Sequence, residues 1–267
     1  MRAGAPIAEP DSVAEGRSRP LPAAGGATGP FRVVGRLGSS TVCEVWHARD
    51  ASGRDLALKV LKPQWATPAG ERLLEHEHAV LARLDHPAIV RTHGLVRHAG
   101  RPALALELLE GGDLVPLAGS APRHWLDAAG QALDALRSLH AAGWAHRDVK
   151  ARNVLLDGRG RARLVDFASA ARLGAPRPRG GTTAAHARPR AGTVVDAADD
   201  AWAFAVLLYE LLHGRLPAAA GPGAGADEAL VGRLFAAVTR LLDPRETPAA
   251  GSLCALANVI ESVIPRT

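Results

Sequence analysis

The sequence predicts an α+β fold of two lobes: a small antiparallel β lobe that carries one helix, then a larger lobe that is mainly α-helical. Three observations lead to this prediction. Strand-type runs separated by turns fill residues 31–61, one 3.6-residue apolar period covers 68–84, and helical periods dominate beyond residue 123. Gly111 and Gly112 separate the two halves, so we expect a hinge there and a ligand site between the lobes.

The strands of the small lobe are expected from alternating apolar residues between turns. The run from Val42 to Trp46 alternates inward and outward, and a turn at Ser52 and Gly53 connects it to a third run. Hairpins in succession imply an antiparallel sheet. The expected strands are 31–37, 42–46, 56–61, a strand around Leu95, and 103–108.

One helix interrupts these strands. Apolar residues recur at spacings of three and four from about Pro68 to Leu84, and Pro87 ends the helix because proline cannot continue it. Glu77 falls on the same face as the apolar residues of this helix. The expected face consists of Leu73, Leu74, Glu77, Leu81 and Leu84.

The second half is expected to be helical apart from one short β pair. The helices are expected at 123–142, 197–213, 227–242 and 249–263, and the β pair at 153–156 and 161–165. Residues 1–30 are rich in Pro, Gly, Ala and Ser without a hydrophobic period, which predicts a disordered tail. One ordered domain, 31–265, is expected, with its small lobe at about 31–108, its hinge at about 107–113 and its large lobe at about 114–265.

Composition narrows the class of protein. The 267 residues are 47% hydrophobic with a net charge of +5, which excludes wholesale disorder. The arginines are dispersed and aromatic residues make up only 4%, so no nucleic-acid partner is expected. The sequence has no uncharged apolar run of about 18 residues and no signal-peptide core, which predicts no membrane span. Cys43 and Cys254 are too few for a disulfide framework, and the cytoplasm is the expected location.

Lysine and asparagine are scarce enough to mark positions of interest. Of 32 basic residues only three are lysines, and the chain has two asparagines, a composition typical of a bacterial gene of high G+C content. A guanidinium cannot replace an ammonium group at a phosphate without a change in geometry. Lys59, Lys150 and Asn153 resist this compositional bias and are therefore candidates for function.

Two loops carry polar groups suited to phosphoryl chemistry. Residues 146–153 have the sequence His-Arg-Asp-Val-Lys-Ala-Arg-Asn, and Asp166 follows on the far side of the expected β pair. Asn153 and Asp166 offer the hard oxygen ligands that Mg²⁺ prefers, while nucleotide phosphates and water would complete the octahedron. Asp148 can accept a hydroxyl proton, and Lys150 can neutralise charge on a phosphoryl group. Turn or helix capping is the competing interpretation of both aspartates, and the joint spacing disfavours it.

This segment resembles the catalytic loop of the protein kinases, and residues 166–168, Asp-Phe-Ala, are similar to the metal-binding Asp-Phe-Gly triplet of that family. Ala57-Leu58-Lys59 resembles the third-strand lysine motif, and Glu77 resembles the helix glutamate that pairs with that lysine. The resemblance covers about residues 31–262 and implies a protein-kinase-like fold. Two further matches are the gatekeeper and hinge at 106–112 and the start of the central helix of the large lobe at 200–203.

The resemblance implies ATP with Mg²⁺, or with Mn²⁺ as an alternative, and a role for each matching residue. The metal ligands would be Asn153 and Asp166. Catalytic roles fall on Asp148, Lys150, Lys59, Glu77 and Thr182, because Gly181-Thr182-Thr183 resembles the start of the substrate-facing loop. The implied ATP-binding residues are Leu37, Gly38, Ser40, Cys43, Val45, Ala57, Lys59, Leu106, Glu107, Leu109, Asp113 and Leu155.

The chain departs from the family pattern in the phosphate-binding loop and in the triplet. Gly38 matches the first glycine of the loop, but Ser40 and Cys43 stand at the second and third positions. We expect these side chains to stiffen the loop, so that it holds the phosphates less closely. Ala168 replaces the glycine of the triplet, a change that we expect to be tolerated.

The segment after Asp166 departs further. The family's Ala-Pro-Glu motif is absent, with Ala-Arg-Pro-Arg at 187–190 as the nearest match, and Thr247 replaces the arginine expected to pair with its glutamate. Both partners of one buried ion pair are therefore expected to be lost together, because loss of one would leave a buried charge. In the family, the arginine that Arg147 matches usually binds a phosphate on this segment. Residues 214–226 replace a frequent peptide-docking helix.

Three hypotheses follow. The first is a serine/threonine protein kinase that transfers the γ-phosphoryl of ATP to a protein Ser/Thr hydroxyl, and Lys150 two residues after Asp148 favours this branch. The second is a pseudokinase that binds ATP as a regulatory module, which the altered loop and missing motif favour. The third is a small-molecule phosphotransferase, which usually lacks the lysine that corresponds to Lys150. A protein substrate is the expected partner, and the oligomeric state stays open.

Overall fold

The computed structural model describes residues 31–178, 184–189, 192–218, 224–243 and 251–263. The expected tail at 1–30 lies outside the described residues, as do Thr182 and Thr247.

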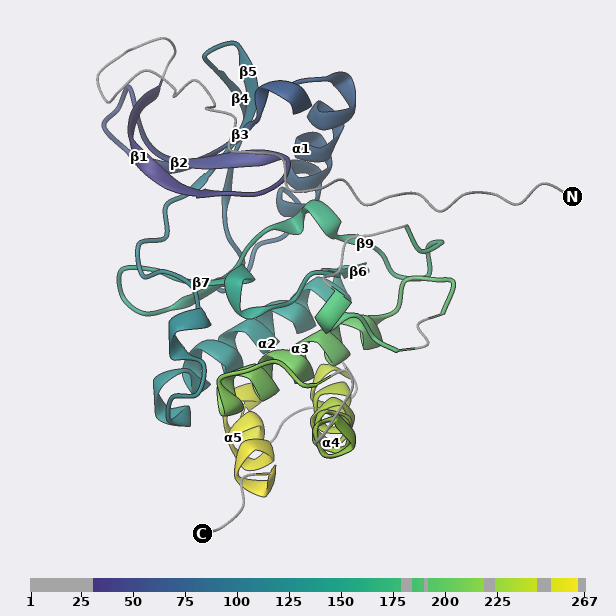
Figure 1. The fold of residues 1–267 in the computed structure, drawn as a ribbon. Helices are drawn as coiled ribbons and strands as arrows, with labels where there is room; N and C mark the ends of the chain where they lie inside the picture. The colour runs from purple at the N-terminus through teal and green to yellow at the C-terminus, as the bar shows by residue number, and fades with distance from the viewer. Residues whose placement is uncertain (1–30, 179–183, 190–191, 219–223, 244–250, 264–267) are drawn as a thin grey trace, which may run out of the picture.

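The small lobe is a five-stranded antiparallel sheet in the order β1-β2-β3-β5-β4, which confirms the predicted β lobe (Figure 1). In the strand register Lys59 faces Val45 on one neighbouring strand and Leu104 on the other. Both flanking strands are hydrogen-bonded to β3, so the lysine is fixed along the centre of the sheet. The strands are β1 (Phe31–Ser39), β2 (Cys43–Asp50), β3 (Asp55–Leu61), β4 (Thr92–His98) and β5 (Arg101–Glu107).

The helix α1 (Pro68–Leu81) packs against this sheet. It begins where Pro68 supplies a preset φ and the Thr67 hydroxyl accepts the Gly70 N–H at 3.3 Å. The predicted helix face was partly wrong. Leu73 is 40% exposed, because it stands about 100° around the helix from Leu74, and the buried stripe runs through Leu74, Glu77, Val80 and Leu81.

In the described residues the large lobe is built around four α-helices, as predicted. The helix α3 is capped by Asp196 at its N-terminus and by Gly214, with φ of +69°, at its C-terminus. Two β pairs, β6 (Trp144–Ala145) with β9 (Ala171–Arg172) and β7 (Val154–Leu156) with β8 (Ala162–Leu164), lie between the lobes and frame the loops of the site (Figure 1). The helices are α2 (Leu126–Ala141), α3 (Ala197–His213), α4 (Ala224–Leu242) and α5 (Gly251–Val263).

Several element boundaries differ from the prediction, and one strand pair was not predicted. The helix α2 starts later because residues 122–124 form a 3₁₀ turn, and α4 starts three residues earlier than expected, at Ala224. The β6–β9 pair was not predicted, since two-residue strands leave no periodic pattern in the sequence.

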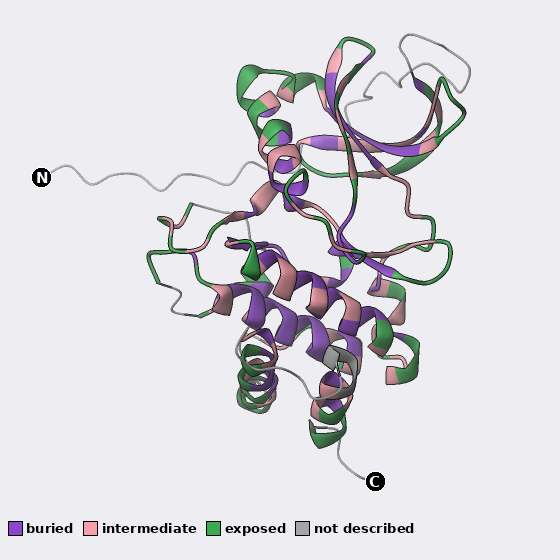
Figure 2. Cartoon of the chain, turned by 180° about the vertical axis from the view of Figure 1, so that it is seen from behind, coloured by how far each residue is buried: buried purple, intermediate pink, exposed green. Residues whose placement is uncertain are grey.

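The core is concentrated in the large lobe, where α2 and α3 are lined by buried residues (Figure 2). Trp125, Phe204 and Tyr209 are among its largest fully buried side chains. A smaller cluster around Leu56 and Leu58 fills the β lobe. The helices α2 and α3 thus form a rigid base for the catalytic loop. Within the described ranges, no helix combines the length and apolarity needed to cross a membrane.

Candidate active site

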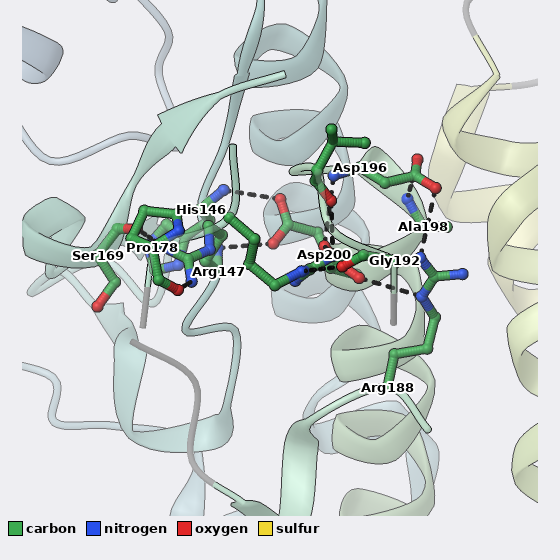
Figure 3. A network of polar contacts seen from close by, with 12 residues as sticks. His146, Arg147, Ser169, Pro178, Arg188, Gly192, Asp196, Ala198 and Asp200 are labelled. Atoms are coloured by element: carbon green, nitrogen blue, oxygen red, sulfur yellow. Dashed lines mark hydrogen bonds and ion pairs between the residues drawn. The ribbon is translucent and has the colours of Figure 1, made fainter. Parts of the chain in front are cut away.

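The loop at 146–153 is anchored to the N-terminal end of α3. The buried Asp200 carboxylate accepts the backbone N–H groups of His146 and Arg147, each at 2.7 Å (Figure 3). Burial would raise the pKa of Asp200, but the hydrogen bond to His140 and the backbone donors hold that pKa below its usual value. Arg147 adopts a φ of +66°, which is rare for a side chain other than glycine. The anchor therefore fixes a strained turn immediately before Asp148.

Asp148 lies in a compact polar group on this loop. Its carboxylate is 2.6 Å from Lys150 Nζ, and Asn153 Nδ2 donates to the carboxylate at 2.9 Å and to the Asp148 carbonyl at 2.7 Å. The Asn153 amide thus fixes the Asp148 side chain, and Lys150 supplies a positive charge beside it. A carboxylate held in this way can accept a proton while the neighbouring ammonium stabilises negative charge.

Lys59 lies between two carboxylates from different elements. Its Nζ is 2.6 Å from Glu77 Oε2 on α1 and 2.8 Å from Asp166 Oδ1. Burial alone would lower the pKa of Lys59, but these two carboxylates raise it well above its usual range, so the side chain is charged. The contacts join the β lobe, α1 and the loop that follows β8 at one point.

Asp166 is itself held in an unusual conformation. Its φ is +63°, and the next residue, Phe167, is fully buried against the His146 ring at a centroid distance of 4.7 Å. Burial favours the neutral form, yet the Lys59 ammonium holds the pKa of Asp166 below its usual value. The carboxylate is therefore ionised and available to a cation.

The donor set fits a divalent metal that brings other ligands with it. Asn153 turns its amide nitrogen toward Asp148, which leaves its amide oxygen as a ligand, and Asp166 offers a carboxylate. Among the described residues there is no group of three or more His, Cys, Asp or Glu side chains placed to hold a metal. Two protein oxygens supplemented by phosphate and water is the arrangement in which Mg²⁺ is usually bound.

The expected phosphate-binding loop is closed by one side-chain and one backbone hydrogen bond. The Ser40 hydroxyl accepts the Cys43 N–H at 3.0 Å, and the Ser40 N–H donates to the Cys43 carbonyl at 2.8 Å. Cys43 is buried, and burial raises the pKa of its thiol to about 11, so the thiol is protonated and unreactive at neutral pH. Leu37 and Gly38, at the end of β1, lie beside this turn, and Leu37 is exposed.

The hinge lies against the β7–β8 hairpin. Asp113 of the hinge forms a β-bridge with Leu155 of the hairpin. The Gly111 N–H donates to Leu156 O at 2.8 Å. The Glu107 carboxylate accepts the Arg91 N–H at 2.9 Å, so its side chain is used within the protein. The remaining residues expected at ATP lie on β2, β3, β5 and the hinge: Val45, Ala57, Leu106 and Leu109.

A buried histidine near the catalytic loop was not expected from the sequence. His186 is 5% exposed, and its Nε2 lies 4.0 Å from Glu210 Oε2 on α3. Burial, assisted by the Lys150 charge and opposed by that of Asp148, lowers the pKa of His186 to about 4. No sequence pattern marks this histidine, because its surroundings come from segments far apart in the chain.

Comparison with known proteins agrees with this geometry. A protein kinase domain family matches residues 31–248. CBL-interacting protein kinase 4 of Oryza sativa subsp. japonica is 38% identical over 207 residues, which cover 71% of this chain and 45% of that protein. A DNA damage-responsive serine/threonine-protein kinase of Deinococcus radiodurans is 35% identical over 204 residues, 71% of this chain and 30% of that protein.

A serine/threonine-protein kinase of Myxococcus xanthus, pkn2, is 33% identical over 208 residues, 71% of this chain and 25% of that protein. The chain spans less than half the length of these curated relatives. The match nevertheless includes both lobes, the hinge and the loops described above. The chain therefore belongs to the protein kinase domain family.

Proposed function

We propose that this chain is a serine/threonine protein kinase that transfers the γ-phosphoryl group of ATP to a Ser or Thr hydroxyl of a protein. The observation that carries the proposal is the group formed by Asp148, Lys150 and Asn153, in which one carboxylate contacts an ammonium at 2.6 Å and an amide at 2.9 Å. The contact of Lys59 with Glu77, linked to Asp166, provides the second half of such a site.

In the proposed reaction the hydroxyl oxygen bonds to the γ-phosphorus, the bond to the β–γ bridging oxygen breaks, and ADP leaves. Asp148 orients the hydroxyl and accepts its proton, and Lys150 stabilises the charge on the transferred group. Lys59, held by Glu77, grips the α- and β-phosphates. Asn153 and Asp166 would hold Mg²⁺, or Mn²⁺ in its place, which supplies charge neutralisation to the phosphates.

A pseudokinase is the second candidate, and the turn closed by Ser40 and Cys43 is the observation that favours it. A phosphate-binding loop that bonds to itself offers fewer free N–H groups to a nucleotide. Against it, the polar groups around Asp148 and Lys59 are complete. A small-molecule phosphotransferase is not favoured, because the matched relatives are named as protein kinases.

The test is transfer of labelled γ-phosphate to a generic basic protein, with Mg²⁺ and Mn²⁺ compared. We expect Asp148→Asn and Lys59→Met to lower transfer by at least about 100-fold, since each removes a group that acts on the reacting atoms or the phosphates. Lys62→Met is a matched control for the lysine and Asp85→Asn for the aspartate, and both should transfer at the wild-type rate. Wild-type protein that binds Mg·ATP in a thermal melt without transfer would instead establish the pseudokinase.

We also propose that the domain acts in the cytoplasm. The support is that Cys43 is buried and free and that ATP would be the phosphoryl donor. Fractionation of the source cells, with the chain detected by antibody, tests this location, and recovery in an extracellular fraction would contradict it.

A further inference from the structure

Two neighbouring aspartates at the start of α3 hold different parts of the large lobe. Asp200 accepts the backbone of the catalytic loop, as described above. Asp199 faces the segment between β9 and α3, where its carboxylate receives Arg177 Nη2 at 2.6 Å and Arg188 Nε at 3.0 Å. We call Asp199, Arg177 and Arg188 the arginine clamp.

Arg177 joins the two limbs of this segment. Besides Asp199, its guanidinium donates to Gly192 O at 2.7 Å and to Val194 O at 2.9 Å. The limbs also bond through their backbones, with the Arg177 N–H donating to Thr193 O at 2.8 Å and the Val195 N–H to Ala175 O at 2.9 Å. One side chain thus holds the outgoing limb, the returning limb and α3 together.

Arg188 holds the part of the segment that lies between the limbs. It bonds Asp199 through Nε, and its Nη2 lies 3.4 Å from Asp196 Oδ2, the capping carboxylate of α3 (Figure 3). His186, two residues earlier, lies near Glu210. Arg188 therefore ties this part of the segment to the same N-terminal end of α3 as the two limbs, whereas His186 lies near the C-terminal end of the helix.

The clamp continues to the catalytic loop through the residue next to Arg177. Arg147 donates to Pro178 O at 3.1 Å and to Ser169 O at 3.3 Å (Figure 3). Arg147 directly precedes Asp148, so a shift of residues 176–178 would pull on the backbone that carries the proposed base. Asp199 and Asp200 are adjacent in the sequence, so the arginine clamp and the catalytic loop are attached to the same end of α3.

Burial makes these contacts hard to replace by water. Asp199 is 7% exposed, and its carboxylate also accepts the Asp196 N–H at 3.3 Å. A carboxylate buried to this degree needs its partners, since removal of one leaves the other charge poorly solvated. A planar guanidinium that bonds three acceptors at fixed angles also sets the orientation of the segment, which a lysine could not do.

We propose that Asp199, Arg177 and Arg188 are positioning residues that hold the segment between β9 and α3 in register with Asp148, so that a protein hydroxyl can be presented to the site. The inference rests on the proposed function and assigns to this segment an internal, charge-based attachment. The effect belongs to the acceptor protein and not to ATP, because Arg177 and Arg188 contact the segment and α3 while Lys59 and the hinge lie elsewhere.

The first test measures amide hydrogen exchange in the full chain without nucleotide. In Arg177→Ala and Asp199→Asn, the amides of residues 174–178 and 192–195 should exchange at least about tenfold faster than in wild type. Arg177→Lys keeps the positive charge but lacks the planar guanidinium, and it should give an intermediate increase in exchange rate. Arg49→Ala, which removes a comparable ion pair with Asp55 in the β lobe, should leave this segment unchanged. Exchange within about twofold of wild type in Asp199→Asn would overturn the clamp.

The second test separates positioning from a merely structural role. For the same variants, kcat/KM for the acceptor protein should fall at least about tenfold, while the Kd for Mg·ATP stays within about twofold of wild type. Arg177→Lys should recover part of the loss. Faster exchange with unchanged acceptor kinetics would refute the positioning role. If wild type transfers no phosphate, the proposed function fails, and the exchange result alone then supports or refutes the clamp.

Discussion

Asp200 offers a perturbation whose cost can be worked from its contacts. The fully buried carboxylate receives the backbone N–H groups of His146 and Arg147 at 2.7 Å each and His140 Nε2 at 2.8 Å. In Asp200→Ala these N–H groups lose their acceptor at a fully buried position. Each buried donor left without a partner costs about 1–3 kcal/mol, so two cost about 2–6 kcal/mol.

An opposing contribution reduces this figure. The alanine also removes a buried negative charge, whose transfer from water is unfavourable in the folded state. We therefore expect Asp200→Ala to lower the free energy of unfolding by about 2–4 kcal/mol, against a typical domain stability of about 5–15 kcal/mol. Asp200→Asn retains one oxygen acceptor but places an NH₂ group against the second donor, and it should lose about half as much.

The assay is equilibrium urea unfolding followed by tryptophan fluorescence, with Glu228→Ala as control. Glu228 is an exposed residue of α4, and its loss should change the free energy of unfolding by no more than about 0.5 kcal/mol. Phosphate transfer by Asp200→Asn is measured beside wild type under conditions in which both are folded, and it should be reduced because Asp148 follows the freed backbone. An alanine variant as stable as the control variant would refute the assigned role of the carboxylate.

Three further predictions concern other parts of the site. Ser40→Gly removes the acceptor of the Cys43 N–H, which frees the loop, and we expect the Kd for Mg·ATP to fall about two- to fivefold in calorimetric titration; an unchanged Kd would contradict a restraining turn. His186 has a folded-state pKa lowered from 6.5 to about 4, so the unfolded chain binds more protons between these values and stability falls as pH falls through this window. In urea unfolding, the free energy of unfolding of wild type should therefore fall between about pH 7 and about pH 5 by up to about 1 kcal/mol per pH unit more than that of His186→Gln. Equal losses in the two proteins would show that this histidine is not the titrating group. Gly111→Ala would place a Cβ 2.7 Å from Leu156 Cβ, so we expect it to destabilise the hinge by about 1–3 kcal/mol in the same assay, with wild-type stability as the opposing result.

The fold was largely predictable because its signals are local. Strand alternation, the 3.6-residue period and turn residues depend on neighbours in sequence, and they placed the five-stranded sheet and the helices of the large lobe. The errors arose where local patterns carry no information. Leu73 is an apolar residue of the type found in cores, but it faces solvent. The two-residue strands β6 and β9 exist only through their pairing with each other.

The sequence marks the residues of the candidate site by type, and their roles stay predictions, but it does not give their geometry. Lys59, Glu77 and Asp166 were expected at one site through the resemblance to a family, and the structure places Lys59 Nζ within 2.8 Å of both carboxylates. The hydrogen bonds that close the loop at Ser40, and the burial of His186, could not be foreseen. Both depend on distances across turns and between segments, which spacing in the sequence does not fix.

The arginine clamp shows why residue type predicts some sites and not others in this chain. Lysine is rare here, with three residues among 32 basic positions, so a lysine at a phosphate-binding position carries information by its mere presence. Arginine is the ordinary basic residue of the chain, and nothing in the sequence distinguishes Arg177 or Arg188 from an arginine on a solvated surface. What distinguishes them is the buried Asp199 carboxylate that both reach. An attachment made from an abundant residue type is therefore visible only once the fold brings its partners together, and it must be tested through the segment that it holds.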